Sequence, residues 1–97
     1  MAKENQDTVE EYYVVALFPD DRDLETTTVK GRNLDAKSAA LKGASLLAGF
    51  EKNEDSGYKV EKDHGTRSRG GWKRFIVENR FGEPFEVAVA HKISKLL

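Results

Sequence analysis

The run DAKSAALKGASLLAG, residues 35–49, decides the fold of this chain because it predicts a single amphipathic helix. Asn33 or Asp35 can cap its start, since either side chain can accept a hydrogen bond from an unpaired N–H of the first turn, and Gly49 is suited to its end. Gly43 costs up to about 1 kcal/mol relative to alanine, which indicates close backbone contact or simple tolerance. The helix is expected to reach about Ala48, with one apolar stripe formed by Ala40, Leu41, Ala44, Leu47 and Ala48.

Strands are expected on both sides of this helix in the sequence, at residues 10–19, 24–30, 57–62, 72–78 and 85–91. The first has apolar residues on both faces, which indicates a strand inside the sheet. Its short connection to the second favours an antiparallel hairpin. Residues 93–97 either extend the last strand or form a short helical turn.

A helix with one apolar stripe must bury that stripe against a sheet. The sequence therefore predicts a two-layer α+β fold, with one helix packed on a mostly antiparallel sheet and the element order ββαβββ. This order is compatible with a β-grasp-like arrangement. We expect a disordered acidic N-terminal arm at residues 1–9 and a single domain at residues 10–97. The segment from Tyr13 to Gly49 resembles the strand–strand–capped-helix pattern of many short bacteriophage and prokaryotic accessory proteins, a resemblance that carries no function.

The amino-acid composition limits the cellular compartment and the kinds of chemistry expected for this protein. The 97 residues include no cysteine, which favours a reducing, cytoplasmic location and excludes thiol chemistry. No apolar run approaches the roughly 20 residues that a membrane span needs, so no membrane association is expected. The net charge of −1 conceals an asymmetry: residues 1–25 carry −6 and the remainder +5. Such a distribution can steer a partner even when the total is near zero.

The stretch HGTRSRGGWKR, residues 64–74, is the candidate binding site. It combines four fixed positive charges, three glycines and the only tryptophan, and it is expected to form a long hairpin loop between the third and fourth strands. Arginine pairs bidentately with phosphates and carboxylates, and an adjacent tryptophan can stack on a base or fill a protein pocket. The predicted contact residues are Arg67, Arg69, Trp72, Lys73 and Arg74.

Catalytic and metal sites are not expected. The pair Asp63–His64 is isolated, and the acidic run at residues 20–23 lacks the glycine and terminal glutamate of a calcium loop. The chain is therefore predicted to be a small non-enzymatic binding or regulatory domain without cofactor. Its first expected partner is a protein with an acidic patch. The alternative is DNA or RNA, with the same loop acting as a wing, although a pI near 6.1 is low for a dedicated nucleic-acid domain. The oligomeric state is left open.

Overall fold

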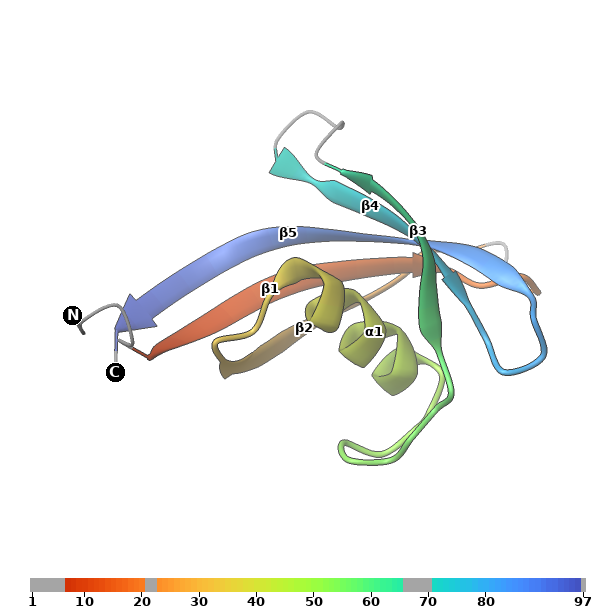
Figure 1. Cartoon of the computed structure of the whole chain (residues 1–97), viewed down its shortest axis with the longest axis horizontal. Helices are drawn as coiled ribbons and strands as arrows, with labels where there is room; N and C mark the ends of the chain where they lie inside the picture. Colours follow the sequence, from red (N-terminus) through yellow and green to blue (C-terminus); the bar gives the residue numbers. More distant parts are fainter. Residues whose placement is uncertain (1–6, 21–22, 66–70, 97) are drawn as a thin grey trace.

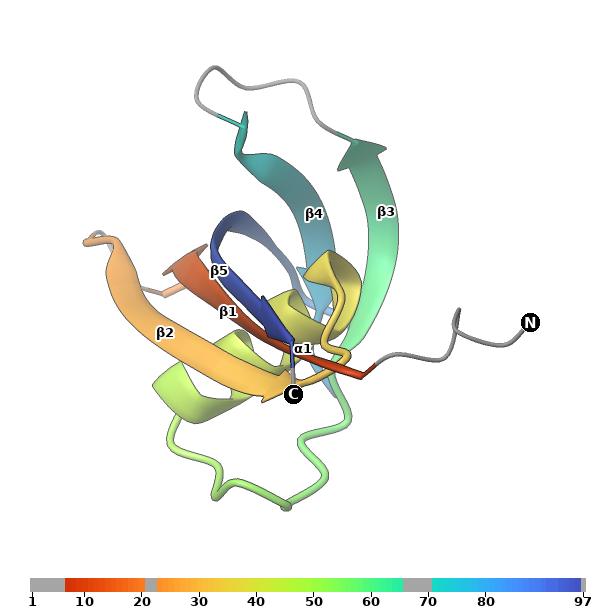
Figure 2. The same cartoon turned by 90° about the vertical axis from the view of Figure 1, so that its left-hand side faces the viewer.

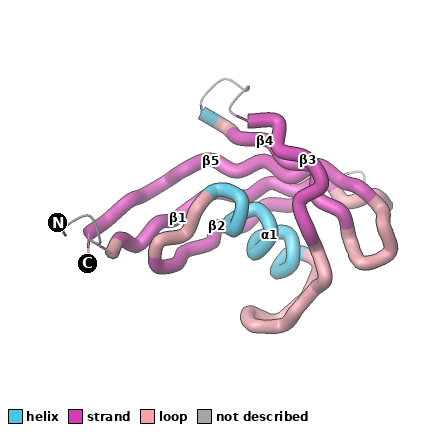
Figure 3. The backbone as a smooth tube through the Cα atoms, in the orientation of Figure 1, coloured by secondary structure: helices cyan, strands magenta, loops and turns pink. Residues whose placement is uncertain are grey.

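The computed structural model describes residues 7–20, 23–65 and 71–96, and in them it has one helix packed on a five-stranded sheet (Figures 1 and 3). The predicted two-layer α+β fold and the order ββαβββ are confirmed. The elements are β1 (Thr8–Leu17), β2 (Glu25–Arg32), α1 (Ala36–Leu47), β3 (Lys59–Gly65), β4 (Lys73–Glu78) and β5 (Pro84–Leu96).

The sheet has the strand order β2-β1-β5-β4-β3, and its four pairings are antiparallel. β1 lies inside the sheet and forms a hairpin with β2, as the sequence predicts. Figure 2 views the sheet almost end-on, with α1 on one side and with β2 and β4 curving away on either side of β5. The last strand, β5, lies between β1 and β4 and pairs with both. Its pairing with β1 brings the N-terminal and C-terminal strands of the chain side by side.

β1 begins at Thr8, two residues earlier than the strand expected from the sequence. Asn33 explains the extension. Its backbone N–H donates to the Thr8 carbonyl at 2.8 Å, and its side-chain oxygen accepts from the Thr8 N–H at 2.9 Å. Asn33 takes a left-handed φ of 53°, which asparagine tolerates better than most residues. It therefore closes the end of β2 and does not cap the helix.

β5 continues to Leu96, so the expected extension of the last strand is correct and the alternative helical turn is wrong. The extension pairs with the start of β1, where Thr8 faces Leu96. A β-bulge interrupts this pairing: Tyr12 faces His91 and Glu11 faces Ile93, which leaves Lys92 as the extra residue.

Both ends of α1 are closed by local hydrogen bonds. Asp35 is the N-cap, and its carboxylate accepts from the Ser38 N–H at 2.7 Å. At the other end Gly49 has φ +97°, the Gly49 N–H donates to the Leu46 carbonyl, and the Phe50 N–H donates to the Ser45 carbonyl, both at 3.0 Å. These two bonds form a Schellman motif, which ends the helix where the sequence predicts.

The buried stripe of α1 is rotated relative to the expected one. Ala39, Ala40, Gly43 and Ala44 are buried, whereas Leu41 and Leu47 are only partly buried and Ala48 is exposed. Small residues face the sheet because the helix backbone approaches it closely. The opposing core side chains come from four strands: Val14, Ala16, Val29, Phe75, Val77, Phe85, Val87 and Val89.

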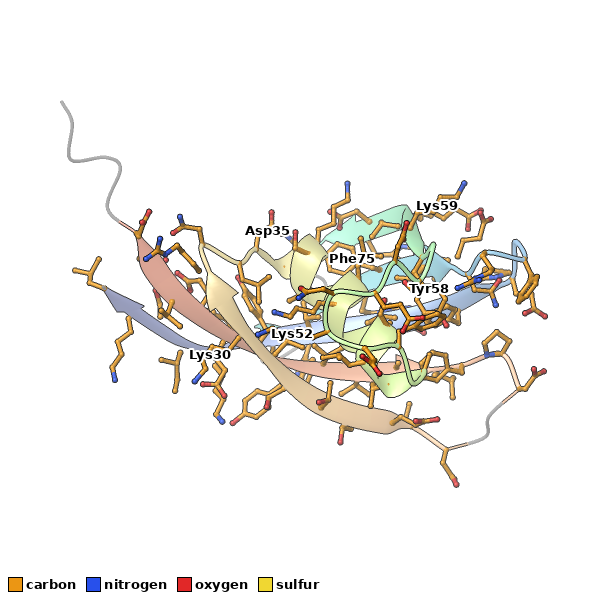
Figure 4. All side chains as sticks on the ribbon, turned by 90° about the horizontal axis from the view of Figure 1, so that it is seen from below. Lys30, Asp35, Lys52, Tyr58, Lys59 and Phe75 are labelled. Carbon is orange, nitrogen blue, oxygen red and sulfur yellow. The ribbon has the colours of Figure 1, made fainter. Side chains whose placement is uncertain are left out.

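An aromatic cluster closes the end of the core beneath the loop at residues 50–58. Phe85 lies 5.0 Å from Phe18 and 5.5 Å from Tyr58 between ring centroids, and Tyr58 lies 5.7 Å from Phe50. Figure 4 shows Tyr58 and Phe75 among the side chains between helix and strands. Phe50 is half-buried against Tyr58.

A pair of serines attaches this loop to the helix. The Ser45 hydroxyl donates to the Leu41 carbonyl, so the 2.6 Å contact between the two hydroxyls leaves Ser56 as the donor to Ser45. The Ser56 oxygen also accepts from the Tyr58 N–H at 3.2 Å. Ser56 is buried, and these bonds satisfy its polar group.

Candidate functional site

The face of the sheet opposite α1 is the candidate site, and we call it the open face. Side chains alternate along each strand, and the residues buried against the helix, such as Val14 and Val89, alternate with residues that face the other way. The register aligns Thr28, Tyr13 and Ala90 across three strands of the open face. Lys73 is paired with Val89 in the antiparallel ladder, so the residue before it, Trp72, falls opposite the residue after Val89, which is Ala90. Trp72 therefore continues this row.

A hollow of about 620 Å³ lies on the open face between Trp72 and the β1–β2 hairpin. Ala90 separates Tyr13 from Trp72 in the row, and its small side chain leaves space between the two aromatic residues. Tyr13 keeps 43% of its surface exposed and Trp72 is half-buried. The lining residues are Tyr13, Val14, Val15, Thr26, Thr27, Thr28 and Trp72.

A second hollow of about 240 Å³ adjoins the first, and the two share Val15. Its other lining residues are Leu17, Leu24, Glu86 and Ala88. Leu24 is 63% exposed and Leu17 is 39% exposed. The centre of the open face is therefore a continuous apolar strip, wider than the scattered exposed apolar residues that any protein surface carries.

Charge is also distributed unevenly between the two faces. In the described strands, the open face carries the basic residues Lys30, Arg32, Lys59, Lys62, Arg74, Lys92 and Lys95, against the acidic residues Glu11, Glu78 and Glu86, and a further acid, Glu61, is the extra residue of a bulge in β3 beside Lys62. On the helix side of the same strands, alternation places Glu10, Glu25 and Asp63, with Lys73 as the base. The open face is positive, although the whole chain has a net charge of −1.

Glu11, Glu78 and Glu86 on the open face each form an ion pair with a basic residue of an adjacent strand. Arg74 contacts Glu86, Lys92 lies 3.3 Å from Glu11, and Lys59 lies 3.6 Å from Glu78. These pairs are partly exposed, so they contribute little to stability. These pairs neutralise the three carboxylates, and Arg32 pairs in the same way with Asp7 at 3.6 Å, so the excess positive charge of the open face comes from Lys30, Lys62 and Lys95.

The bulge in β5 brings one of these cations to the aromatic row. Lys92 is the extra residue of the bulge, and its Nζ lies 5.2 Å from the centroid of the Tyr13 ring. This distance is within the range of a cation–π interaction. A positive charge therefore lies next to the ring that forms one wall of the larger hollow.

The predicted contact residues are distributed over both faces. Arg67 and Arg69 lie outside the described residues. Trp72 and Arg74 come together on the open face, Trp72 in the wall of the hollow and Arg74 beside Glu86. Lys73 lies in the opposite register, in line with the buried Phe75.

Sequence reasoning missed Tyr13, Thr26, Thr28, Lys30 and Lys92 as site residues. The apolar residues on both faces of residues 10–19 correctly indicated an internal strand, but an internal strand is covered at its edges and not necessarily on both faces. The alternation of Thr26, Thr28 and Lys30 was the available signal, because it placed three hydrogen-bonding side chains on one face of β2.

A separate polar cluster surrounds Glu10, at the end of the sheet where β1 begins. The Glu10 carboxylate accepts hydrogen bonds from the hydroxyls of Thr8 and Ser94, and His91 Nε2 lies 2.6 Å from it. These hydrogen bonds, with that from Thr8 the largest, lower the pKa of Glu10 below its ordinary value. His91 lies in the register of the buried valines, but it is exposed, and its ring centroid lies 5.0 Å from that of Tyr12.

Two further features bear on the site. Among the described residues, no three histidine, aspartate or glutamate side chains are grouped closely enough to hold a metal ion. The helix in the described part of the chain has neither the length nor the apolar character that crossing a membrane requires.

Comparison with protein-family models, with curated proteins and with solved structures gives no match. The site must therefore be interpreted from its own chemistry, and the β-grasp-like arrangement stays an expectation.

Proposed function

We propose that this chain is a non-enzymatic binding domain that holds an anionic macromolecular partner against its open face. The observation that carries the proposal is the segregation of charge, which gathers seven basic side chains around the apolar strip. The two partners expected from the sequence, a protein with an acidic patch and a nucleic acid, are both anionic and both fit this surface.

The low pI of the whole chain does not argue against binding of an anionic partner, because charge is distributed unevenly between the two faces of the sheet. A pI of about 6.1 averages a positive open face with acidic residues elsewhere in the chain. A partner that approaches one face responds to the local potential of that face, because at physiological salt charges further away than about 8 Å are largely screened. The apolar strip supplies contact area, and the surrounding cations supply orientation and rate of association.

Heparin, a simple polyanion, tests the proposal. We expect the chain to bind immobilised heparin at low salt and to elute as salt rises. The double variant Lys30→Glu, Lys62→Glu reverses two exposed charges on the two edge strands of the open face, and it should elute at clearly lower salt.

The matched control is Lys37→Glu, Lys52→Glu, which makes the same change in net charge at exposed positions of the helix layer. This control should elute close to the parent. Equal losses in the two double variants would contradict the proposal, because they would show that net charge alone governs binding.

A further inference from the structure

We propose that the partner is a single-stranded nucleic acid whose bases stack in the hollow between Tyr13 and Trp72 while its phosphates contact the surrounding lysines. This inference rests on the proposed function and names the chemical class of the partner. It depends on the joint presence of exposed aromatic rings, hydroxyl groups and cations at one place on the sheet.

The aromatic residues favour a ligand with flat faces. Proteins that bind single strands combine a basic groove with aromatic side chains on which successive bases stack. Tyr13 and Trp72 lie in one row of the open face with only Ala90 between them, and the small Ala90 side chain leaves space between the two rings. An acidic protein segment could also contact these two rings, but a nucleic acid offers both a flat base for the rings and a phosphate for the lysines in every repeating unit.

The cation beside Tyr13 supports the same ligand. Lys92 Nζ lies over the Tyr13 ring, 5.2 Å from its centroid, so a base that stacks on this ring takes the opposite face or displaces the ammonium group, which is then free to contact a phosphate. Thr26 and Thr28 add hydroxyl groups to the wall of the hollow, and these can donate to or accept from base edges. Rings, hydroxyls and charge therefore line or adjoin the same hollow.

The geometry favours a single strand over a duplex. In a duplex the flat faces of the bases are stacked on one another, and a protein reaches their edges by inserting a helix or a β-ribbon into a groove. The aromatic rings here lie in a hollow of the sheet, with β2 on one side and the beginning of β4 on the other. Only an unstacked base can enter between them.

Intrinsic fluorescence provides a direct test, because Trp72 is the only tryptophan of the chain. The probe is an oligothymidylate or oligouridylate of about twelve nucleotides, within the range of sites covered by single-strand-binding domains. We expect it to quench the Trp72 emission on binding at low salt. A duplex of the same length should bind more weakly, and poly-glutamate should cause little quenching.

Variants separate stacking from charge. Tyr13→Ala should weaken oligonucleotide binding roughly tenfold, as loss of one stacking ring does, and should leave the salt dependence unchanged. Tyr13→Phe retains the ring and should bind like the parent. Phe81→Ala, a change at an 80% exposed aromatic in the β4–β5 turn, is the control for nonspecific loss of aromatic surface.

Trp72→Ala removes the second ring and should weaken oligonucleotide binding as Tyr13→Ala does. If Trp72→Ala does not fold, Trp72→Phe is compared with the parent by the fluorescence anisotropy of a labelled oligonucleotide. Retention of some binding in the phenylalanine variant, below that of the parent, supports stacking at this position.

The outcomes distinguish this inference from the proposed function. If heparin binds in a manner sensitive to Lys30 and Lys62 but oligonucleotides neither bind nor quench, the nucleic-acid assignment is wrong and the anionic-partner proposal stands. Tighter binding of poly-glutamate than of oligothymidylate would identify a protein partner instead. If neither heparin nor oligonucleotide binds at low salt, both proposals fail.

Discussion

Gly43 of α1 lies directly over Val14 of β1, so close that a Cβ atom on Gly43 would come within 2.6 Å of Val14 Cγ1. Both residues are buried, and Val14 has no exposed surface. This contact sets the distance between the helix and the sheet. Of the two explanations that the sequence allows for a glycine inside the helix, close backbone contact is the correct one.

Gly43→Ala should therefore destabilise the fold despite the higher helix propensity of alanine. Overpacking of a core costs about 1–3 kcal/mol, against a gain of up to about 1 kcal/mol from propensity. Urea denaturation would measure the difference. Lys37→Ala, an exposed change in the same helix, should be nearly neutral. The double variant Gly43→Ala, Val14→Ala should lose less than the sum of its single changes, since the second change makes room for the first; strict additivity would contradict the contact.

Phe85→Ala should be among the most damaging changes in the aromatic cluster. Phe85 is 5% exposed and packs against both Phe18 and Tyr58, so truncation should cost about 3–5 kcal/mol. Phe81 lies four residues earlier, is 80% exposed and should tolerate alanine within about 0.5 kcal/mol. If Phe85→Ala does not fold, Phe85→Leu should still unfold at lower urea than the parent. Similar losses at the two positions would exclude the core role of Phe85.

The Glu10 cluster predicts a loss of stability in acid. Hydrogen bonds from Thr8, Ser94 and His91 favour the ionised carboxylate and lower its pKa below the ordinary value of 4.5. The folded state then binds fewer protons than the unfolded state, so this contribution is complete above pH 4.5 and is lost as pH falls through the lowered pKa.

Carboxyl titration by NMR should place the midpoint of Glu10 below 4.5, and Thr8→Ala should move it upward. In chemical denaturation between about pH 3 and 6, Glu10→Gln should flatten the fall in stability on the acid side. Glu61→Gln, at an exposed position of β3, should keep the pH dependence of the parent. A Glu10 midpoint at or above 4.5 would contradict the hydrogen-bond assignment.

Arg67 and Arg69 remain contact residues predicted from the sequence. The double change to alanine should leave the urea midpoint unchanged and weaken binding to the anionic partner. For a single-stranded nucleic acid, loss of two phosphate contacts should reduce the slope of log affinity against log salt by about 1.4. Lys37→Ala, Lys52→Ala is the control of equal charge. An unchanged affinity and slope in the arginine variant would remove both residues from the site.

Much of the fold was predictable because its signals are local. Asp35 caps the helix and Gly49 ends it through hydrogen bonds that reach only a few residues along the chain. The short connection after β1 made an antiparallel hairpin the natural pairing, and one amphipathic helix required a sheet to cover its stripe. The two-layer α+β class and the element order follow from these local features.

The candidate site was only partly predictable, because two residues of the same row can be far apart in sequence. Trp72 was recognised from its basic neighbours, but Tyr13 is 59 positions away in the chain and reaches the same hollow only through β5. The sequence of β1 has apolar residues on both faces, so alternation alone could not say which face the helix covers.

By itself, the sequence determined the elements, their order, the two ends of the helix and the need for a single helix–sheet interface, because capping, periodicity and turn chemistry act over a few residues. Only the tertiary structure decided that β5 lies between β1 and β4, that the helix rests on the Val14 side, and that Tyr13 faces outward with the lysines. The physical reason is close packing: the small residues of α1 and Gly43 in particular fit against Val14 and Ala16, and this choice leaves the opposite, positive face open.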